Sequence, residues 1–245
     1  MIEFQDVKLV FNNNPVADGL SFSIQFHEKI AILGSSGQGK TTILKLILGL
    51  IQPDGGRILI DGKDITNFSE SQLRDIRMNF SIVFQEGALF DSLSVRENVA
   101  FCLLEREKPT KEVVESTVRD LLSRVGIEDA INLMPDELSG GMQRRVAIAR
   151  SLAACKPRMM LYDEPTSGLD PITADTICGL INELSSGHPP ERTGLVIVTH
   201  DVPDAVKVAE RFMYLGNGKI RFDGNLDTLK STKDAELRRF IKDIL

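Results

Sequence analysis

The hydrophobic residues in the N-terminal part of the chain follow the patterns of β-strands. Residues 21–26 alternate Phe22, Ile24 and Phe26 with polar neighbours, which is the period of a half-buried strand. Residues 29–33, KIAIL, are a continuous apolar run, typical of a strand that is covered on both faces. A glycine-rich stretch and an apolar helical pattern follow directly, so we expect a strand, a loop and a helix in succession.

Between residues 87 and 154 the pattern is that of helices alone. The stretch that begins at Ser94 has Glu97 three residues later, which is the spacing of a capping box. The stretch that ends at Gly126 repeats valine and leucine at helical spacing, and glycine is a common helix terminator. We interpret this segment as a helical lobe inserted into a strand-rich chain.

Strands and helices alternate again after residue 154. Residues 158–165 and 194–200 predict buried strands, and Asp170 followed by proline marks the start of a helix between them. Residues 212–224 predict a hairpin that turns at Asn-Gly. The last residues predict a short amphipathic helix.

These patterns predict one α/β domain over residues 1–245. An α/β core is expected over residues 1–86 and 155–230, the helical lobe over 87–154, and a C-terminal helix over 231–245.

Composition and charge narrow the choice of function. Hydrophobic residues make up 42% of the chain and charged residues 26%, as in ordinary folded proteins. The formal net charge of −6 argues against a nucleic-acid partner, which normally requires a basic face. No apolar run is long enough to span a membrane, and the N-terminus lacks the features of a signal peptide. We therefore expect a cytosolic protein.

The glycine-rich stretch matches the phosphate-loop pattern GxxxxGK[ST] between a strand and a helix. Its glycines let backbone N–H groups face phosphate oxygens, and the helix that follows adds its positive N-terminal end. Lys40 can reach the β and γ phosphates, and the Thr41 hydroxyl can ligate Mg²⁺. The alternative is a turn without a ligand, and the lysine and threonine at these positions argue against it. The residues of this expected ATP site are Gly34, Ser35, Ser36, Gly37, Gln38, Gly39, Lys40, Thr41 and Thr42.

Two consecutive carboxylates, Asp163 and Glu164, end an apolar strand. Ligands bind at that edge of an open α/β sheet. Neighbouring residues of an extended chain point different ways, so Asp163 can serve the Mg²⁺ while Glu164 acts on the attacking water as a base. A pair of strand-end acids without a function is the alternative, which the phosphate loop makes less attractive.

A second glycine-rich turn, LSGGMQRR at residues 138–145, heads a second helical pattern. Either it is only a turn, or it serves a nucleotide that the first loop does not hold within its own chain.

The chain resembles the ATPase subunits of ABC transporters over nearly its whole length. The matching motifs, in the family's order, are Walker A at 34–42, the Q-loop at Gln85, the signature at 138–143, Walker B at 159–164, the D-loop at 167–170 and the switch histidine at His200. The resemblance implies a P-loop NTPase (RecA-like) core with an N-terminal antiparallel β subdomain and an inserted helical subdomain.

The resemblance also answers the question of the second turn. Such ATPases work as head-to-tail dimers, in which the signature of one subunit closes over the ATP and Mg²⁺ held by the other. Ser139, Gly140 and Gly141 would then face the partner's γ phosphate, with Met142 beside them where the family normally has Gln or Glu. The family further implies that Gln85 and His200 align the γ phosphate, the water and Mg²⁺, and that Asp170 lies at the nucleotide site.

Phe11 occupies about the position of the aromatic residue that stacks on adenine in this family. A phenyl face can stack on a base. The alternative is a phenylalanine in the core of a strand.

The segment 85–101 and the residues before the signature look most like the ATPases of Mla/MCE phospholipid-transport systems. This resemblance implies a multi-helix permease and an MCE-domain periplasmic protein as partners, and a peripheral position on the cytoplasmic side of the inner membrane. Relatives in amino-acid import share the GLDP sequence and the length, so import of amino acids or of another small polar solute remains the alternative.

Rival functions of a different class are ABC ATPases of DNA repair and of translation. The former separate the two halves of the ATPase by a long coiled coil, and the latter carry two cassettes on one chain; neither feature is present here. A regulatory cassette that only binds ATP would lack Glu164 or His200, and both are present.

Overall fold

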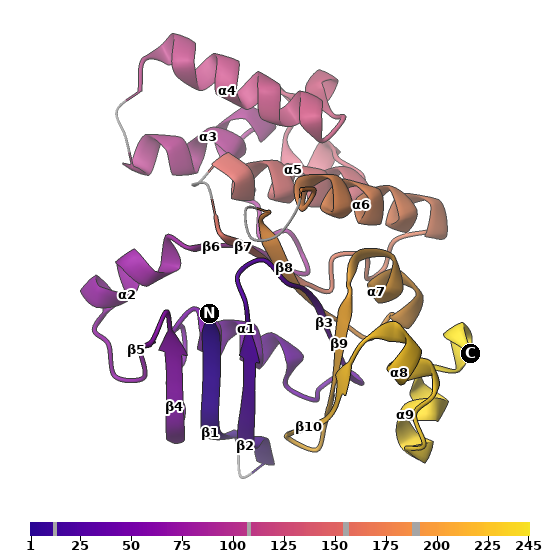
Figure 1. Ribbon diagram of the computed structural model, residues 1–245. Helices are drawn as coiled ribbons and strands as arrows, with labels where there is room; N and C mark the ends of the chain where they lie inside the picture. Colours follow the sequence, from indigo (N-terminus) through magenta and orange to yellow (C-terminus); the bar gives the residue numbers. More distant parts are fainter. Residues whose placement is uncertain (12–13, 107–108, 154–156, 188–191) are drawn as a thin grey trace.

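The computed structural model describes residues 1–11, 14–106, 109–153, 157–187 and 192–245. They form two β-sheets, with helices between the sheets and on the far side of one of them (Figure 1). The α/β class predicted from the sequence is confirmed. His188 and Cys155 lie outside the described residues.

The N-terminal sheet is antiparallel, with strand order β2-β1-β4-β5. Its strands are β1 (Ile2–Phe11), β2 (Asn14–Ile24), β4 (Gly55–Ile60) and β5 (Lys63–Asp64). The alternating pattern predicted the strand character from Ser21 onward, whereas β2 begins at Asn14, which pairs with Phe11 of β1. Backbone pairing, which no side-chain pattern records, therefore extends this strand.

The second sheet has the order β10-β9-β3-β8-β7-β6, and its first five strands in the chain are parallel. The strands are β3 (Lys29–Leu33), β6 (Phe80–Val83), β7 (Met159–Asp163), β8 (Gly194–Thr199), β9 (Arg211–Gly216) and the antiparallel β10 (Lys219–Gly224). The hairpin turns at Asn217 and Gly218, both with positive φ, as an Asn-Gly turn requires. The carboxyl ends of β3, β7 and β8 meet at one edge.

Helix α1 (Lys40–Ile47) begins at that edge and lies in the core between the two sheets. Its buried side chains Ile43, Leu44 and Ile47 share one hydrophobic cluster with β1, β2, β4 and one face of β3, β7 and β8. The start of α1 is thus fixed by packing on both sides, which holds the preceding loop in place.

A helical layer covers the other face of the parallel sheet (Figure 1). Its helices are α3 (Val95–Arg106), α4 (Lys111–Arg124), α5 (Gly140–Ala153) and α6 (Pro171–Leu184). Short 3-10 turns at Glu128–Ala130 and Pro135–Glu137 join α4 to α5. The predicted capping box is present, since the Ser94 backbone N–H donates to Glu97 Oε2 over 2.8 Å. Within the described part of the chain, no helix is both long and apolar enough to cross a bilayer.

The remaining helices are α2 (Glu70–Arg77), α7 (Val202–Val208), α8 (Leu226–Lys230) and α9 (Ala235–Phe240), followed by a 3-10 turn at Lys242–Ile244. The sequence predicted one C-terminal helix over 231–245, whereas α9 begins after Asp234, whose side chain accepts from the N–H groups of Glu236 and Leu237. Leu237 and Ile241 are fully buried in the same cluster as the helical layer. These two side chains of the C-terminal segment therefore belong to the core.

Candidate functional site

The phosphate loop connects β3 to α1 and is shaped by glycine. Gly39 has a φ of 90°, and a Cβ atom there would lie 2.4 Å from Val16 Cγ1. Only glycine satisfies both the left-handed backbone and this close approach. The loop is held from outside as well, because the Asn217 N–H of the β9–β10 hairpin donates to Gln38 Oε1 over 2.9 Å.

Lys40, the first residue of α1, is only 6% exposed. Its Nζ donates to the carbonyl oxygens of Gly34 at 2.8 Å and Ser35 at 3.2 Å, so the side chain lies inside the curve of the loop. The same atom lies 3.1 Å from Glu164 Oε1. A buried ammonium is therefore shared between the loop and the carboxylate that follows β7.

Thr41 and Asp163 are joined although 122 positions separate them in the chain. The Thr41 hydroxyl donates to Asp163 Oδ1 over 2.9 Å. Burial raises the pKa of the Asp163 carboxyl, and the hydrogen bond from Thr41 acts in the opposite direction. Two hard oxygen donors thus lie together at the start of α1.

Glu164 follows β7 with a φ of 47°, an uncommon conformation for a residue with a side chain. Its backbone N–H donates to the Val198 carbonyl over 2.9 Å, which ties it to the end of β8. His200 Nδ1 lies 2.9 Å from Glu164 Oε2 and carries the proton of this bond, because a carboxylate only accepts. Thr199 also donates its hydroxyl proton to Oε2, over 3.1 Å.

A cavity of about 360 Å³ opens over the loop and these side chains. It is lined by Val16, Ser36, Gly37, Gly39, Lys40, Thr41, Thr42, Gln85, Glu164, Ser167 and His200. The structure thus brings together most of the expected ATP residues with all three expected catalytic residues. Such a cavity can bind phosphates through N–H groups and a lysine, and it holds a carboxylate and an imidazole to act on water.

Some of the expected site residues do not line this cavity. Gly34, Ser35 and Gln38 belong to the loop itself, where the first two offer carbonyl oxygens to Lys40 and Gln38 binds the hairpin. Asp170 does not line it either. Its carboxylate caps α6, accepting from the N–H groups of Ile172 and Thr173 at 3.1 Å each and from the Thr173 hydroxyl at 2.6 Å.

Phe11 ends β1 and is 48% exposed, so it is not the core residue of the alternative interpretation. Asn14, which pairs with it, lies two residues before the cavity residue Val16. Stacking on adenine stays a prediction. Val16, Ser167 and Thr199 were missed by the sequence analysis. Of these three residues, only Ser167 belongs to a motif that the sequence shows, the D-loop.

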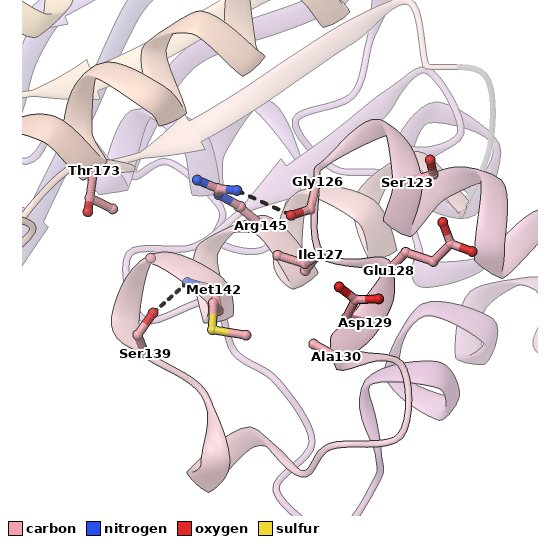
Figure 2. Close-up of a pocket in the computed structure, with 11 residues that line it drawn as sticks. Ser123, Gly126, Ile127, Glu128, Asp129, Ala130, Ser139, Met142, Arg145 and Thr173 are labelled. Atoms are coloured by element: carbon pink, nitrogen blue, oxygen red, sulfur yellow. Dashed lines mark hydrogen bonds between the residues drawn. The ribbon is translucent and has the colours of Figure 1, made fainter.

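The second glycine-rich turn forms a separate cavity of about 570 Å³ (Figure 2). The start of α5 lines it with Ser139, Gly141 and Met142. Helix α6 adds Thr173, and the turn after α4 adds Glu128 and Asp129. The Met142 N–H donates to Ser139 Oγ at 3.3 Å, which leaves the hydroxyl proton of Ser139 free to donate.

Gly141 lets α5 and α6 come close together. A Cβ atom at this position would lie 2.4 Å from Thr173 Cγ2. This cavity and the phosphate-loop cavity share no lining residue, so within the described chain the two turns do not form one site.

The family model described as ABC transporter matches residues 17–167, which include the phosphate loop, the second turn and the Asp163–Glu164 pair. The chain belongs to the ABC transporter family. It is an ATP-binding, ATP-hydrolysing subunit, and the P-loop fold that the sequence predicted is confirmed.

Relatives of this ABC ATPase cover its full length. It is 39% identical to the intermembrane phospholipid transport system ATP-binding protein MlaF of Escherichia coli K12, over 100% of this chain and 89% of that protein. It is 38% identical to the glutamine transport ATP-binding protein GlnQ of the same organism, over 100% of both chains. These relatives take different cargoes by name.

Its fold is similar to a solved dimeric structure of an ATP-binding cassette in a post-hydrolysis state with ADP and Pi. The TM-score is 0.83 at 30% identity, and the match covers 92% of this chain and 99% of that one.

Proposed function

We propose that two copies of this ATPase close head to tail over two ATP molecules and drive a membrane permease. Ser139, Gly140 and Gly141 of each copy then face the γ phosphate held at Lys40 of the other. The separation of the two cavities within one chain supports this arrangement, because each cavity alone offers only part of a nucleotide site. The helical stretch 87–154 acts as the lobe that carries the second turn.

In this proposal Glu164 is the general base. Its carboxylate lies between Lys40 and His200 in the phosphate-loop cavity, where it can receive a proton from a water molecule directed at the γ phosphate. Gln85 and His200 line the same cavity and orient that water and the phosphate. The observation that carries the assignment is this shared carboxylate, buried except for 8% of its surface.

Mg²⁺ fits the oxygen donors at the start of α1. The Thr41 hydroxyl and the Asp163 carboxylate lie together, and the Gln85 side chain lines the same cavity as Thr41. Hydroxyl, carboxylate and amide oxygens are the ligands that this ion accepts. When bound, the ion neutralises charge on the phosphates.

The permease is proposed to dock beside Gln85. Phe90 and Phe101 are 42% and 37% exposed, and their rings lie 4.6 Å apart, centre to centre. Arg150 of α5 lies over Phe90 and donates to the carbonyl oxygens of Gly87 and Ala88, at 2.8 Å each. The two phenylalanines form an exposed apolar surface, and α5, which begins at the second turn, reaches it through Arg150. This connection supports the proposal that closure of the dimer moves the permease.

The cargo is proposed to be phospholipid, moved by a system of the Mla/MCE type with an MCE-domain protein as a further partner. The full-length similarity to MlaF supports this choice. Import of an amino acid is the second candidate, supported by the similarity to GlnQ. In either case the ATPase binds peripherally at the cytoplasmic face of the membrane, through the permease.

Purification of the tagged protein from gently solubilised membranes tests the cargo. We expect mass spectrometry to identify a permease, an MCE-domain protein and bound phospholipid. A permease with a soluble solute-binding protein would instead support amino-acid import and contradict the lipid proposal, while leaving the ATPase chemistry unchanged.

A further inference from the structure

Thr199 is the last residue of β8 and lies beside Glu164 at the edge of the sheet. Strands β7 and β8 pair with Asp163 opposite Val198, and the residues that come next in the chain are Glu164, just after β7, and Thr199, the end of β8. Thr199 is 1% exposed and does not line the phosphate-loop cavity. Its side chain is therefore placed to act on Glu164 from behind, out of contact with the nucleotide.

The hydroxyl of Thr199 has a fixed direction. It accepts from the Asp201 N–H over 2.9 Å, and Asp201 is the N-cap residue of α7. Because the hydroxyl has one proton and a carboxylate only accepts, that proton is directed to Glu164 Oε2, 3.1 Å away. The start of α7 thus sets the orientation of a hydroxyl that holds one carboxylate oxygen.

The other side chains that contact this carboxylate belong to the cavity. Lys40 Nζ lies 3.1 Å from Oε1, and His200 Nδ1 lies 2.9 Å from Oε2. Both side chains line the cavity and, in the proposed mechanism, also serve the phosphates and the water. Thr199 has no such second task, because its two hydrogen bonds use its proton and one lone pair within the protein.

We propose that Thr199 is a positioning residue for the base Glu164. Its hydroxyl, together with the His200 backbone N–H 3.3 Å away, keeps Oε2 in place while the Lys40 and His200 side chains turn to the phosphate, which leaves Oε1 directed at the water. As the water oxygen bonds to the γ phosphorus and ADP leaves, the water proton passes to Oε1. This inference rests on the proposed role of Glu164.

The test compares Thr199→Val, which removes the hydroxyl at constant shape, with Thr199→Ser, which keeps it. Hydrolysis is measured in the membrane complex recovered with the full chain, and ATP affinity is measured by calorimetry with Mg-ATPγS. We expect Thr199→Val to lower kcat about ten-fold or more, the size of one hydrogen bond to a charged group, with affinity unchanged. Thr199→Ser should restore kcat to within about three-fold.

Ser81→Ala is the matched control. Ser81 is a buried hydroxyl on β6 of the same sheet, and it donates to the Ser151 carbonyl away from the cavity. We expect it to lower the melting temperature without changing kcat. If Thr199→Val folds poorly, Thr199→Ala against Thr199→Ser gives the same comparison. Equal kcat values for the variants with and without the hydroxyl would overturn the proposal.

A double variant separates this inference from the proposed function. In single-turnover measurements, Thr199→Val added to Glu164→Gln should cause little further loss, because both changes act through one carboxylate. A full additional loss would show that Thr199 acts elsewhere and would overturn the inference alone. If Glu164→Gln hydrolysed ATP at the wild-type rate, the role of the base would be wrong, and the inference would be withdrawn with it.

Discussion

The two glycine-rich turns of this ATPase have the same local structure, but different side chains surround them. Each places glycine at the beginning of a helix, α1 in one case and α5 in the other. The first is surrounded by Lys40, Glu164 and His200. The second offers the hydroxyl of Ser139 and the thioether of Met142 at the first turn of its helix, and the charged residues of its cavity lie outside that turn.

The difference follows from where each helix begins. Helix α1 starts at the edge of the parallel sheet, where β7 and β8 also end and contribute Asp163, Glu164 and Thr199. Helix α5 starts in the helical layer, where Gly141 lies against Thr173 of α6. A helix N-terminus can bind an anion in either place, but at the sheet edge the ends of β7 and β8 add Glu164 and His200 beside Lys40, the groups that the proposed hydrolysis uses.

The largest expected effect comes from removing the base of the first turn. Glu164→Gln should bind ATP yet hydrolyse it about 10²- to 10⁴-fold more slowly, because an amide cannot take the proton. Phosphate release and equilibrium binding measure the two quantities. Glu183→Gln on the exposed side of α6 is the control. Wild-type turnover in Glu164→Gln would contradict the assignment.

A charge placed on the second turn should disable it without touching the first. Ser139→Arg should leave ATP binding to the monomer intact, prevent ATP-dependent dimers and lower turnover by about 10²-fold, as when a preorganised donor is lost. Light scattering of the purified chain in the Glu164→Gln background measures dimers. Ser116→Arg on exposed α4 is the control, and normal dimerisation of Ser139→Arg would argue against the shared site.

Lys40→Ala should weaken the binding of ATP at the first turn. Loss of a buried ammonium that faces phosphate is expected to lower ATP affinity about ten- to hundred-fold. Lys45→Ala changes an exposed lysine of the same helix and should leave affinity as it is. Calorimetry with Mg-ATPγS distinguishes the two, and equal affinities would show that Lys40 does not bind phosphate.

The smallest effect is expected at Met142, where the family usually has a polar residue. Its backbone N–H makes the bond to Ser139, which any residue can make, and its partly buried side chain packs at the edge of the core. Met142→Gln should therefore cost about 1 kcal/mol of folding free energy and change turnover less than about three-fold. Chemical denaturation and steady-state rates measure both, and a ten-fold loss of rate would assign Met142 a direct role.

The sequence predicted best what is local in the chain. The phosphate loop, the Asp163–Glu164 pair and the Asn-Gly hairpin are contiguous patterns whose physics is short-range, and their positions in the structure agree with the prediction. The cap at Asp170 was predicted from Asp-Pro and is present, since that carboxylate accepts from the N–H groups at the start of α6. The place at the nucleotide site that the family implies for Asp170 stays a prediction.

Contacts between distant segments were beyond the sequence. Val16 lies outside the residues whose alternating pattern predicted a strand, yet it fits against Gly39 and lines the cavity. In the sequence, Thr199 is one more residue of a predicted buried strand. Only the pairing of β7 with β8 shows that its hydroxyl donates to Glu164. Such relations depend on sheet order, which a pattern of apolar positions does not encode.

The anchoring of the C-terminal residues has a practical meaning for anyone who handles the gene. Leu237 and Ile241 are buried with the helical layer, and Arg221 forms ion pairs with Asp234 and Glu236. Removal of this stretch would expose the cluster into which α5 also packs. Leu245, in contrast, is 58% exposed, so an affinity tag can be added after it. Removal of these residues is therefore expected to destabilise the protein, whereas residues added after Leu245 are expected to leave the fold intact.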